Sequence, residues 1–286
     1  MTPQRLGAIP KVLHLTCESP KELNQELRTN ISKLSAQNPD WRVRVYGNRE
    51  CEQFISEHFD ASTLKRYRQI NEKYGAARAD FFRYLCLYRL GGVYLDIKSS
   101  ATIPLNTVIR PGDRFLLSQW HCSPDPQCAA WGQHHELAHI PGGEYMQWTI
   151  ITCAGHPYLE NVIAMVSRNI DKYHRYYYGV GRNAVLSITG PIPYTLAIHA
   201  ILDAHPHRFV DVFGEIGLKY SIYSDRGAHR QLQANHYSRL DEPLIRRNWF
   251  SNMLVFCRET LIRIDRDRIR RHLNRRRAMR HHETGK

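Results

Sequence analysis

The fold is decided by one stretch of the chain, YGAARADFFRYLCLYRLGGVYLDIKSS, which runs from Tyr74 to Ser100. Apolar residues recur near helical spacing in its first half, which predicts a helix with one inward face. Gly91 and Gly92 then end the helix, because glycine adopts the left-handed backbone that such an end often uses. Val93–Leu95 favours a strand. The pattern therefore predicts a helix, a tight turn and a short buried strand of an α/β sheet.

Charged residues interrupt this apolar stretch. Asp80 and Arg83 stand three residues apart, so they can face each other on one side of the helix. Buried charges are costly unless they are paired. A structural ion pair and a functional site both account for the two residues on spacing alone. Asp96 follows the strand, at the edge where open α/β sheets usually bind ligands.

The same residues carry a resemblance to a known family. The pattern A-x-A-D-x-x-R-x-x-x-L-x-x-x-G-G-x-Y-x-D-x-K, from Ala77 to Lys98, resembles the core of the glycosyltransferases with a DXD-type sugar-binding motif. This family, glycosyltransferase family 32, includes yeast-type mannosyltransferases, bacterial capsular and lipopolysaccharide glycosyltransferases and, more distantly, the clostridial glucosylating toxins. Weaker landmarks extend the resemblance over roughly residues 9–250: Ile9–His14, Asn38–Tyr46, Gly155–Pro157, Thr189–Pro191 and Asn235–Tyr237.

The resemblance implies an α/β fold of the GT-A type. This is a Rossmann-like mixed sheet flanked by helices, here with added helices and a basic C-terminal helix, and the donor binds at the carboxyl ends of the strands. It also implies a retaining hexosyltransferase for surface polysaccharide synthesis. Such an enzyme takes a UDP- or GDP-hexose donor and a glycan or glycolipid acceptor.

Residue roles follow from the resemblance, position by position. In the family, residues matching Asp80 and Arg83 bind the sugar and the diphosphate, and the residue matching Tyr94 lies by the nucleotide. The acid matching Asp96 contacts ribose or sugar and helps to hold a metal. The implied catalytic candidates are Asp96, Arg83 and Lys98; the nucleotide-sugar-binding candidates are Asp80, Arg83, Tyr94, Asp96 and Lys98; the metal-ligand candidates are Asp96 and His236.

Two residues depart from the family pattern. Lys98 stands where the second motif acid normally ligates Mn²⁺ or Mg²⁺ on the diphosphate. A lysine repels a divalent cation but can itself neutralise a diphosphate. Either Asp96 holds the metal together with other acids, or Lys98 neutralises part of the diphosphate charge in place of the metal. Cys17 stands where many relatives have a tryptophan that stacks on the base, so the nucleotide cannot be inferred from this position.

Length and composition suit one globular α/β domain. The chain has 286 residues, of which 42% are hydrophobic and 23% charged, and a chain of this size can bury a large core. No window approaches the roughly 20 apolar residues that cross a bilayer. The N-terminus lacks an apolar signal-peptide core, which favours the cytoplasm. Seven scattered cysteines suit reduced thiols.

Two side-chain clusters each allow two interpretations. The first is rich in histidine and cysteine; its spacing is loose for zinc, and a variable loop near the site mouth is the alternative. The second is rich in tyrosine and suits either ordinary packing or a platform for a sugar ring. The first cluster comprises His121, Cys122, Cys128, His134, His135 and His139. The second comprises Tyr173, Tyr176, Tyr177 and Tyr178.

The C-terminal end is strongly basic. Between Arg258 and Arg280 ten arginines face three acids, a net charge of +7 out of +13 for the chain. Ile262, Ile269 and Leu273 share one helical face. We expect a catalytic domain over residues 1–256 and a basic amphipathic helix over residues 257–286. This helix suits an anionic membrane surface, which would place the protein on the inner face of the membrane; the alternative is a solvated helix packed along the domain.

Other classes of function are weighed against this one. A pI near 9.5 is typical of nucleic-acid-binding proteins, but the charge is concentrated at one end and no nucleic-acid module is recognised, so we expect no nucleic-acid partner. Lys98 raises another alternative, a degenerate transferase that binds a sugar nucleotide without turnover. Binding and donor hydrolysis distinguish these classes.

Overall fold

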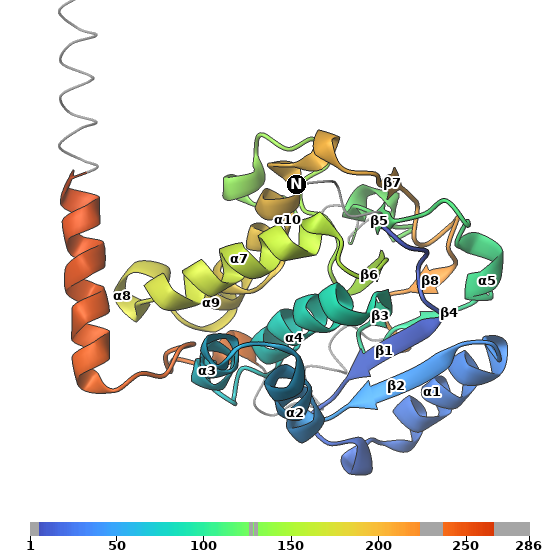
Figure 1. The fold of residues 1–286 in the computed structure, drawn as a ribbon, viewed down its shortest axis with the longest axis horizontal. Coiled ribbons are helices and arrows are strands. Elements are labelled where there is room, and N and C mark those ends of the chain that lie inside the picture. The colour runs from blue at the N-terminus through green and yellow to red at the C-terminus, as the bar shows by residue number, and fades with distance from the viewer. Residues whose placement is uncertain (1–5, 126–127, 129–130, 224–236, 266–286) are drawn as a thin grey trace, which may run out of the picture.

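The computed structural model describes residues 6–125, 128, 131–223 and 237–265 (Figure 1). A six-stranded sheet forms its centre, in the order β2-β1-β3-β6-β5-β7, and β4 and β8 form a separate two-stranded sheet. The strands are β1 Val12–Thr16, β2 Arg42–Tyr46, β3 Gly92–Leu95, β4 Ser100–Ala101, β5 Phe115–Leu117, β6 Thr149–Thr152, β7 Arg208–Phe209 and β8 Leu218–Lys219.

Helices surround the central sheet. The α-helices are α1 Gln25–Gln37, α2 Asn48–His58, α3 Ala61–Gln69, α4 Gly75–Leu90, α5 Leu105–Val108, α7 Pro157–Lys172, α8 Arg175–Tyr178, α9 Gly181–Ile188 and α10 Pro191–His199. Short 3₁₀ turns are η1 Pro20–Glu22, η2 Trp120–Cys122, η3 His135–Leu137, η4 Leu202–Ala204 and η5 Tyr237–Arg239. A further helix spans 249–265. Within the described residues, no helix combines the length and the apolar character that a membrane span requires.

The sheet is mixed. β1 pairs in parallel with β2 and β3, β5 pairs in parallel with β7, and β6 runs antiparallel to both β3 and β5. Helices α2, α4, α7, α9 and α10 contribute to one buried cluster, while α1 and α5 contribute to the cluster on the other face. The expectation of a Rossmann-like mixed sheet flanked by helices is therefore confirmed.

The predicted helix, turn and strand are confirmed as α4, Gly91-Gly92 and β3. Both glycines have positive φ, +64° and +102°. A Cβ at Gly91 would lie 2.5 Å from the Ala154 nitrogen, and one at Gly92 would lie 2.4 Å from the Val12 oxygen. Each of the two positions therefore requires glycine, both because its φ is positive and because a side chain would not fit.

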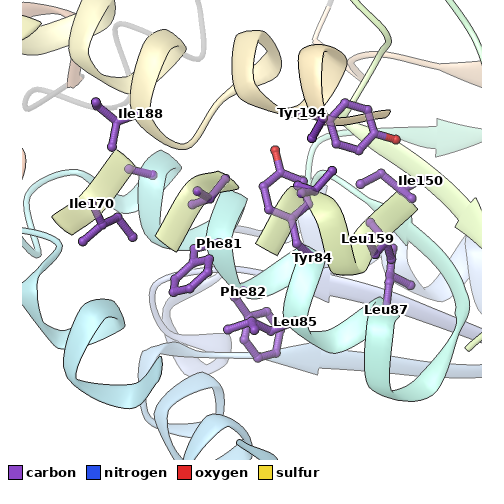
Figure 2. Close-up of a cluster of buried hydrophobic side chains, with 14 of the residues drawn as sticks. Phe81, Phe82, Tyr84, Leu85, Leu87, Ile150, Leu159, Ile170, Ile188 and Tyr194 are labelled. Atoms are coloured by element: carbon purple, nitrogen blue, oxygen red, sulfur yellow. The ribbon is translucent and has the colours of Figure 1, made fainter. Parts of the chain in front are cut away.

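The expectation of a single inward face on α4 is wrong. Every residue from Asp80 to Leu87 is buried, because the sheet lies against one side of the helix and α2, α3 and α7 pack around it. Figure 2 shows side chains of α4 among residues of neighbouring elements, with the rings of Tyr84 and Tyr194 stacked at a centroid distance of 5.5 Å. A helix enclosed in this way needs apolar residues all round, and its charges must find partners inside the protein.

The helix 249–265 begins before the predicted boundary. Residues 256 and 257, where we expected the catalytic domain to end, lie inside it. The division of the chain into two parts stays a prediction. Ile269 and Leu273 of the predicted amphipathic face lie outside the described residues.

Two buried histidines should make the fold sensitive to acid. His14 Nε2 donates to the Gly91 oxygen at 3.0 Å, and its Nδ1 accepts from the Tyr46 hydroxyl at 3.1 Å, an arrangement that uses the neutral ring. Burial lowers the pKa of His14 and of His156 from 6.5 to about 4. The unfolded chain therefore takes up these protons at higher pH than the folded chain.

The contribution of these histidines to the free energy of unfolding should be highest above pH 6.5 and fall as the pH drops toward 4, by roughly 3 kcal/mol for each histidine. Urea titrations at several pH values measure this slope. The variant His14→Gln should have a shallower slope than the wild type. A stability that does not change between pH 7 and pH 4.5 would contradict the prediction.

Candidate active site

Helix and strand geometry brings the middle of α4 beside the end of β3. The chain travels roughly 12 Å from Arg83 to Gly91 at 1.5 Å per helical residue. It returns roughly 13 Å from Gly92 to Asp96 at 3.3 Å per strand residue. Because the Gly91-Gly92 turn reverses the direction, Arg83 and Asp96 arrive at the same level. Local structure alone thus places the acid beside the arginine.

Arg83 is the centre of the polar cluster. Its guanidinium lies 3.2 Å from Asp80 Oδ1 and 3.1 Å from Asp96 Oδ1, and it donates to the Gln147 carbonyl at 2.5 Å. The side chain is 5% exposed. One buried cation therefore balances two carboxylates, which is the pairing that buried charges require. The predicted facing of Asp80 and Arg83 is confirmed.

Tyr94 covers the other side of the guanidinium. The Arg83 Cζ lies 4.4 Å from the centre of the Tyr94 ring, a cation–π contact. The Tyr94 hydroxyl donates to Asp96 Oδ1 at 3.2 Å and lies 2.9 Å from Thr16 Oγ1. Side chains alternate along a strand, so Tyr94 faces α4 while Val93 and Leu95 belong to the opposite cluster. Burial raises the pKa of Tyr94, so its hydroxyl stays protonated.

Asp80 is held from a distant part of the chain. The Thr189 hydroxyl donates to Asp80 Oδ2 at 3.0 Å, and Tyr84 donates to the Thr189 carbonyl at 3.0 Å. Burial raises the pKa of Asp80 to about 6, while the Arg83 charge and the Thr189 hydrogen bond act in the opposite direction. Thr189 belongs to the Thr-Gly-Pro landmark, so the sequence pointed to this segment but not to its contact with Asp80.

Asp96 is the most exposed acid of the cluster. Its side chain is 24% exposed, against 4% for Asp80. β3 ends at Leu95, and a turn follows, closed by a hydrogen bond from the Ser99 nitrogen to the Asp96 carbonyl at 2.8 Å. The Asp96 backbone nitrogen donates to the Trp148 carbonyl at 2.9 Å. The carboxylate is thus fixed by the backbone and by Arg83, yet it can reach a ligand.

Lys98 lies in this same turn. Its Nζ donates to the Tyr220 hydroxyl at 2.9 Å and lies 4.1 Å from the centre of the Tyr220 ring. Tyr220 in turn packs against Trp120, at a centroid distance of 5.2 Å, and against Trp148, at 5.5 Å. Because the backbone turns after Leu95, strand alternation does not decide where Lys98 points. The contact with Tyr220 sets the direction of the Lys98 side chain, which remains partly exposed.

Asp96 is the predicted metal ligand that the structure describes. Asp96 Oδ1 is already engaged by Arg83 and Tyr94, and among the described residues no group of three His, Cys, Asp or Glu could hold an ion. His236, the other predicted metal ligand, lies outside the described residues. In the histidine-rich loop, His134 pairs with Glu144 at 2.7 Å.

A comparison with known families identifies this region. Residues 24–115 match the family described as "Glycosyltransferase sugar-binding region containing DXD motif". This segment is therefore similar to a glycosyltransferase sugar-binding region. It contains the whole of α4, the glycine turn, β3 and the turn with Asp96 and Lys98. The resemblance drawn from the sequence is confirmed over these residues.

Three curated proteins are similar to part of this chain. The chain is 28% identical over 138 residues to an initiation-specific alpha-1,6-mannosyltransferase of Candida albicans, covering 46% of this chain and 34% of the relative. It is 24% identical over 176 residues to the protein of the same name in Schizosaccharomyces pombe, covering 58% and 41%. It is 26% identical over 109 residues to mannosyl phosphorylinositol ceramide synthase SUR1 of Saccharomyces cerevisiae, covering 37% and 27%. The chain thus spans about a third of the length of these relatives.

A solved structure, the PaToxG glycosyltransferase, aligns with 15% identity and a TM-score of 0.47, covering 70% of this chain and 72% of that one.

The structure brings four predicted residues together and places the fifth beside them. Asp80, Arg83, Tyr94 and Asp96 form one cluster, and Lys98 lies on the adjoining turn. Sequence reasoning missed the residues that hold them. The supporting contacts come from Gln147, Tyr220, Thr16 and Thr189. The first three stand in no recognisable motif, and Thr189 was noted only as part of a family landmark.

Proposed function

We propose that this chain is a retaining glycosyltransferase that moves a hexose from a nucleotide-sugar donor to a glycan or glycolipid acceptor. The sugar-binding region supports the reaction class. The names of the curated relatives support mannose as the first sugar to test, since two are mannosyltransferases and the third is a mannosyl phosphorylinositol ceramide synthase by name. A role in surface polysaccharide synthesis is part of the same proposal.

One observation carries the proposal: a buried arginine presents a partly exposed carboxylate at the carboxyl end of a central strand. Arg83 and Tyr94 both contact Asp96 Oδ1, so the remaining oxygen is directed by fixed partners. Carboxylates held in this way are suited to hydroxyl groups of ribose or sugar, because they accept hydrogen bonds without reorganising. Asp80 and Arg83 act mainly by holding Asp96 in place, and direct contact of Arg83 with diphosphate stays a prediction.

The chemistry of the proposed reaction is mostly electrostatic. The acceptor hydroxyl attacks the anomeric carbon from the face that the diphosphate leaves, the carbon–oxygen bond to the diphosphate breaks, and the hydroxyl proton passes to a departing phosphate oxygen. The protein must stabilise the leaving anion and the cationic sugar. Lys98 is the partly exposed cation of the turn, so we assign it to the diphosphate. Asp96 is assigned to the sugar or ribose.

A donor screen tests the proposed function. The full chain is incubated with GDP-mannose, UDP-glucose and other UDP-hexoses, with simple mannosides as acceptors, in Mn²⁺, Mg²⁺ or EDTA. We expect donor hydrolysis or transfer with one donor and retention of the anomeric configuration, which NMR of the product reports. Binding of a donor without any turnover, in every metal condition, would favour the degenerate sugar-nucleotide-binding protein instead. Absence of both binding and turnover would contradict both proposals.

Lys98 should carry part of the role that a divalent ion has in relatives. We expect measurable turnover in EDTA and a loss of about a hundredfold in kcat/KM for Lys98→Ala, in the range of single electrostatic groups. The control Tyr220→Phe keeps the ring beneath Nζ and removes only the hydroxyl, so its loss should be about tenfold or less. An enzyme that is inactive in EDTA, fully rescued by Mn²⁺ and unaffected by Lys98→Ala would contradict this assignment.

A further inference from the structure

The helix 249–265 exposes a stripe of large apolar side chains. Trp249 is 75% exposed and Leu261 is 65% exposed. At 100° per residue, the exposed apolar positions fall within an arc of roughly 140°. We call this set the apolar stripe; it comprises Trp249, Phe250, Met253, Leu254, Leu261 and Ile264. Contiguous apolar surface of this kind marks an interaction site in a folded protein.

A neighbouring face of the helix is fastened to the domain. The ring of Phe256 stacks on Tyr177 at a centroid distance of 5.8 Å and lies 5.0 Å from His174. Arg263 lies over the Tyr177 ring at 4.3 Å, and Thr260 bonds to the Tyr177 hydroxyl. The tyrosine cluster is therefore a packing surface for this helix at Tyr177. Because these contacts fix how the helix is rotated, the apolar stripe is held outward.

The segment before the helix is anchored as well. Arg247 donates to the Tyr173 carbonyl at 2.8 Å, and the Arg246 backbone nitrogen donates to the Gln69 carbonyl at 2.8 Å. Ile245 forms a bridge with Ile70 at the end of α3. In Figure 1 the helix, orange to red, stands at the edge of the molecule next to α8. The stripe thus belongs to a positioned helix at the periphery.

Charge decides what can cover the stripe. Residues 266–286, directly after it in the sequence, contain nine basic and two acidic side chains. A second copy of the chain would bring two such basic segments together, which like charges oppose. An anionic lipid surface attracts the same segment, at about 1 kcal/mol for each basic residue close to it. Apolar and basic groups in succession are the composition of helices that lie in a bilayer interface.

We propose that the helix 249–265 lies along an anionic membrane surface, with the apolar stripe in the boundary between headgroups and acyl chains. Trp249 and Phe250 at its start are the anchors, since aromatic side chains favour this boundary. The net positive charge of residues 266–286 attracts the anionic surface. The surface is a membrane-docking face, fixed to the domain through Tyr177 and Phe256.

Tryptophan fluorescence gives a direct test. The chain has five tryptophans; Trp41, Trp120 and Trp148 are buried, Trp131 is partly buried, and Trp249 is 75% exposed. The full chain is mixed with vesicles of 70% phosphatidylcholine and 30% phosphatidylglycerol that carry brominated acyl chains. We expect quenching that disappears in Trp249→Phe, although this variant still binds the vesicles. Quenching that is unchanged in Trp249→Phe would overturn the proposal.

Sedimentation with the same vesicles gives the second test. The variant Trp249→Ser/Phe250→Ser/Leu261→Ser should lose at least tenfold in vesicle partitioning and keep its melting temperature, because all three side chains are exposed. The matched control Phe209→Ser changes an exposed apolar residue on β7 and should bind as the wild type does. Pure phosphatidylcholine vesicles and 0.5 M salt should both weaken binding.

Two results would overturn the proposal: equal vesicle partitioning of the wild type and the triple variant, or a concentration-dependent dimer that the triple variant abolishes while vesicle binding persists. The second result would place another copy of the chain on the stripe.

Discussion

Replacing Asp96 by asparagine should abolish measurable sugar transfer and leave the protein folded. Asparagine keeps an oxygen that can accept from Arg83 and Tyr94, and the turn is closed by the Asp96 backbone rather than by its side chain. What disappears is the charge that is fixed toward the ligand. Loss of one such group costs a factor of about 10²–10³ in kcat, and loss of sugar or ribose binding adds to it.

The measurement compares donor hydrolysis, transfer and melting temperature of Asp96→Asn with those of the wild type. The matched control is Tyr94→Phe, which removes one hydrogen bond to Asp96 and keeps the ring under Arg83. Its transfer rate should fall much less than that of Asp96→Asn. Near-normal turnover of Asp96→Asn would contradict the assignment of Asp96, and a large drop in its melting temperature would make the residue structural.

Replacing Arg83 by methionine should both destabilise the protein and stop transfer. The change leaves Asp80 and Asp96 without the cation that lies 3.2 Å and 3.1 Å from them. Breaking a buried pair by removing one partner costs about 3–5 kcal/mol. A loss of activity in this variant therefore mixes unfolding with chemistry, and it cannot by itself separate a structural role from a functional one.

A double variant separates the two effects. Asp80→Asn/Arg83→Met removes the buried acid together with the cation, so it should regain much of the stability that Arg83→Met loses. Its kcat/KM should nevertheless remain at least about a hundredfold below wild type, because Asp96 has lost the group that holds it. Urea denaturation and steady-state kinetics on the three proteins measure this. Recovery of both stability and turnover in the double variant would make the Asp80–Arg83 pair purely structural.

Short-range geometry made the centre of the site predictable. A helix of 3.6 residues per turn puts Asp80 and Arg83 on one side, the glycines permit the reversal, and the strand that follows ends at Asp96. These relations span fewer than 25 residues of the chain, from Asp80 to Asp96 and Lys98. The family resemblance rested on the same residues, which is why it was confirmed in this region.

Long-range packing decided the rest. Thr189 reaches Asp80 across 109 residues and Tyr220 reaches Lys98 across 122. No local signal predicts either contact, because a hydroxyl serves equally well in a turn, at a cap or in solvent. The burial of α4 on all sides follows from the elements packed around it.

The sequence by itself predicted a basic amphipathic helix over residues 257–286, since charge and spacing are local properties. The structure describes the first part of this range, within the helix 249–265. Only the tertiary structure decided which of its faces packs on Tyr177 and which is left exposed. A helix can be rotated without any change in its own hydrogen bonds, so its orientation depends on the surface against which it packs.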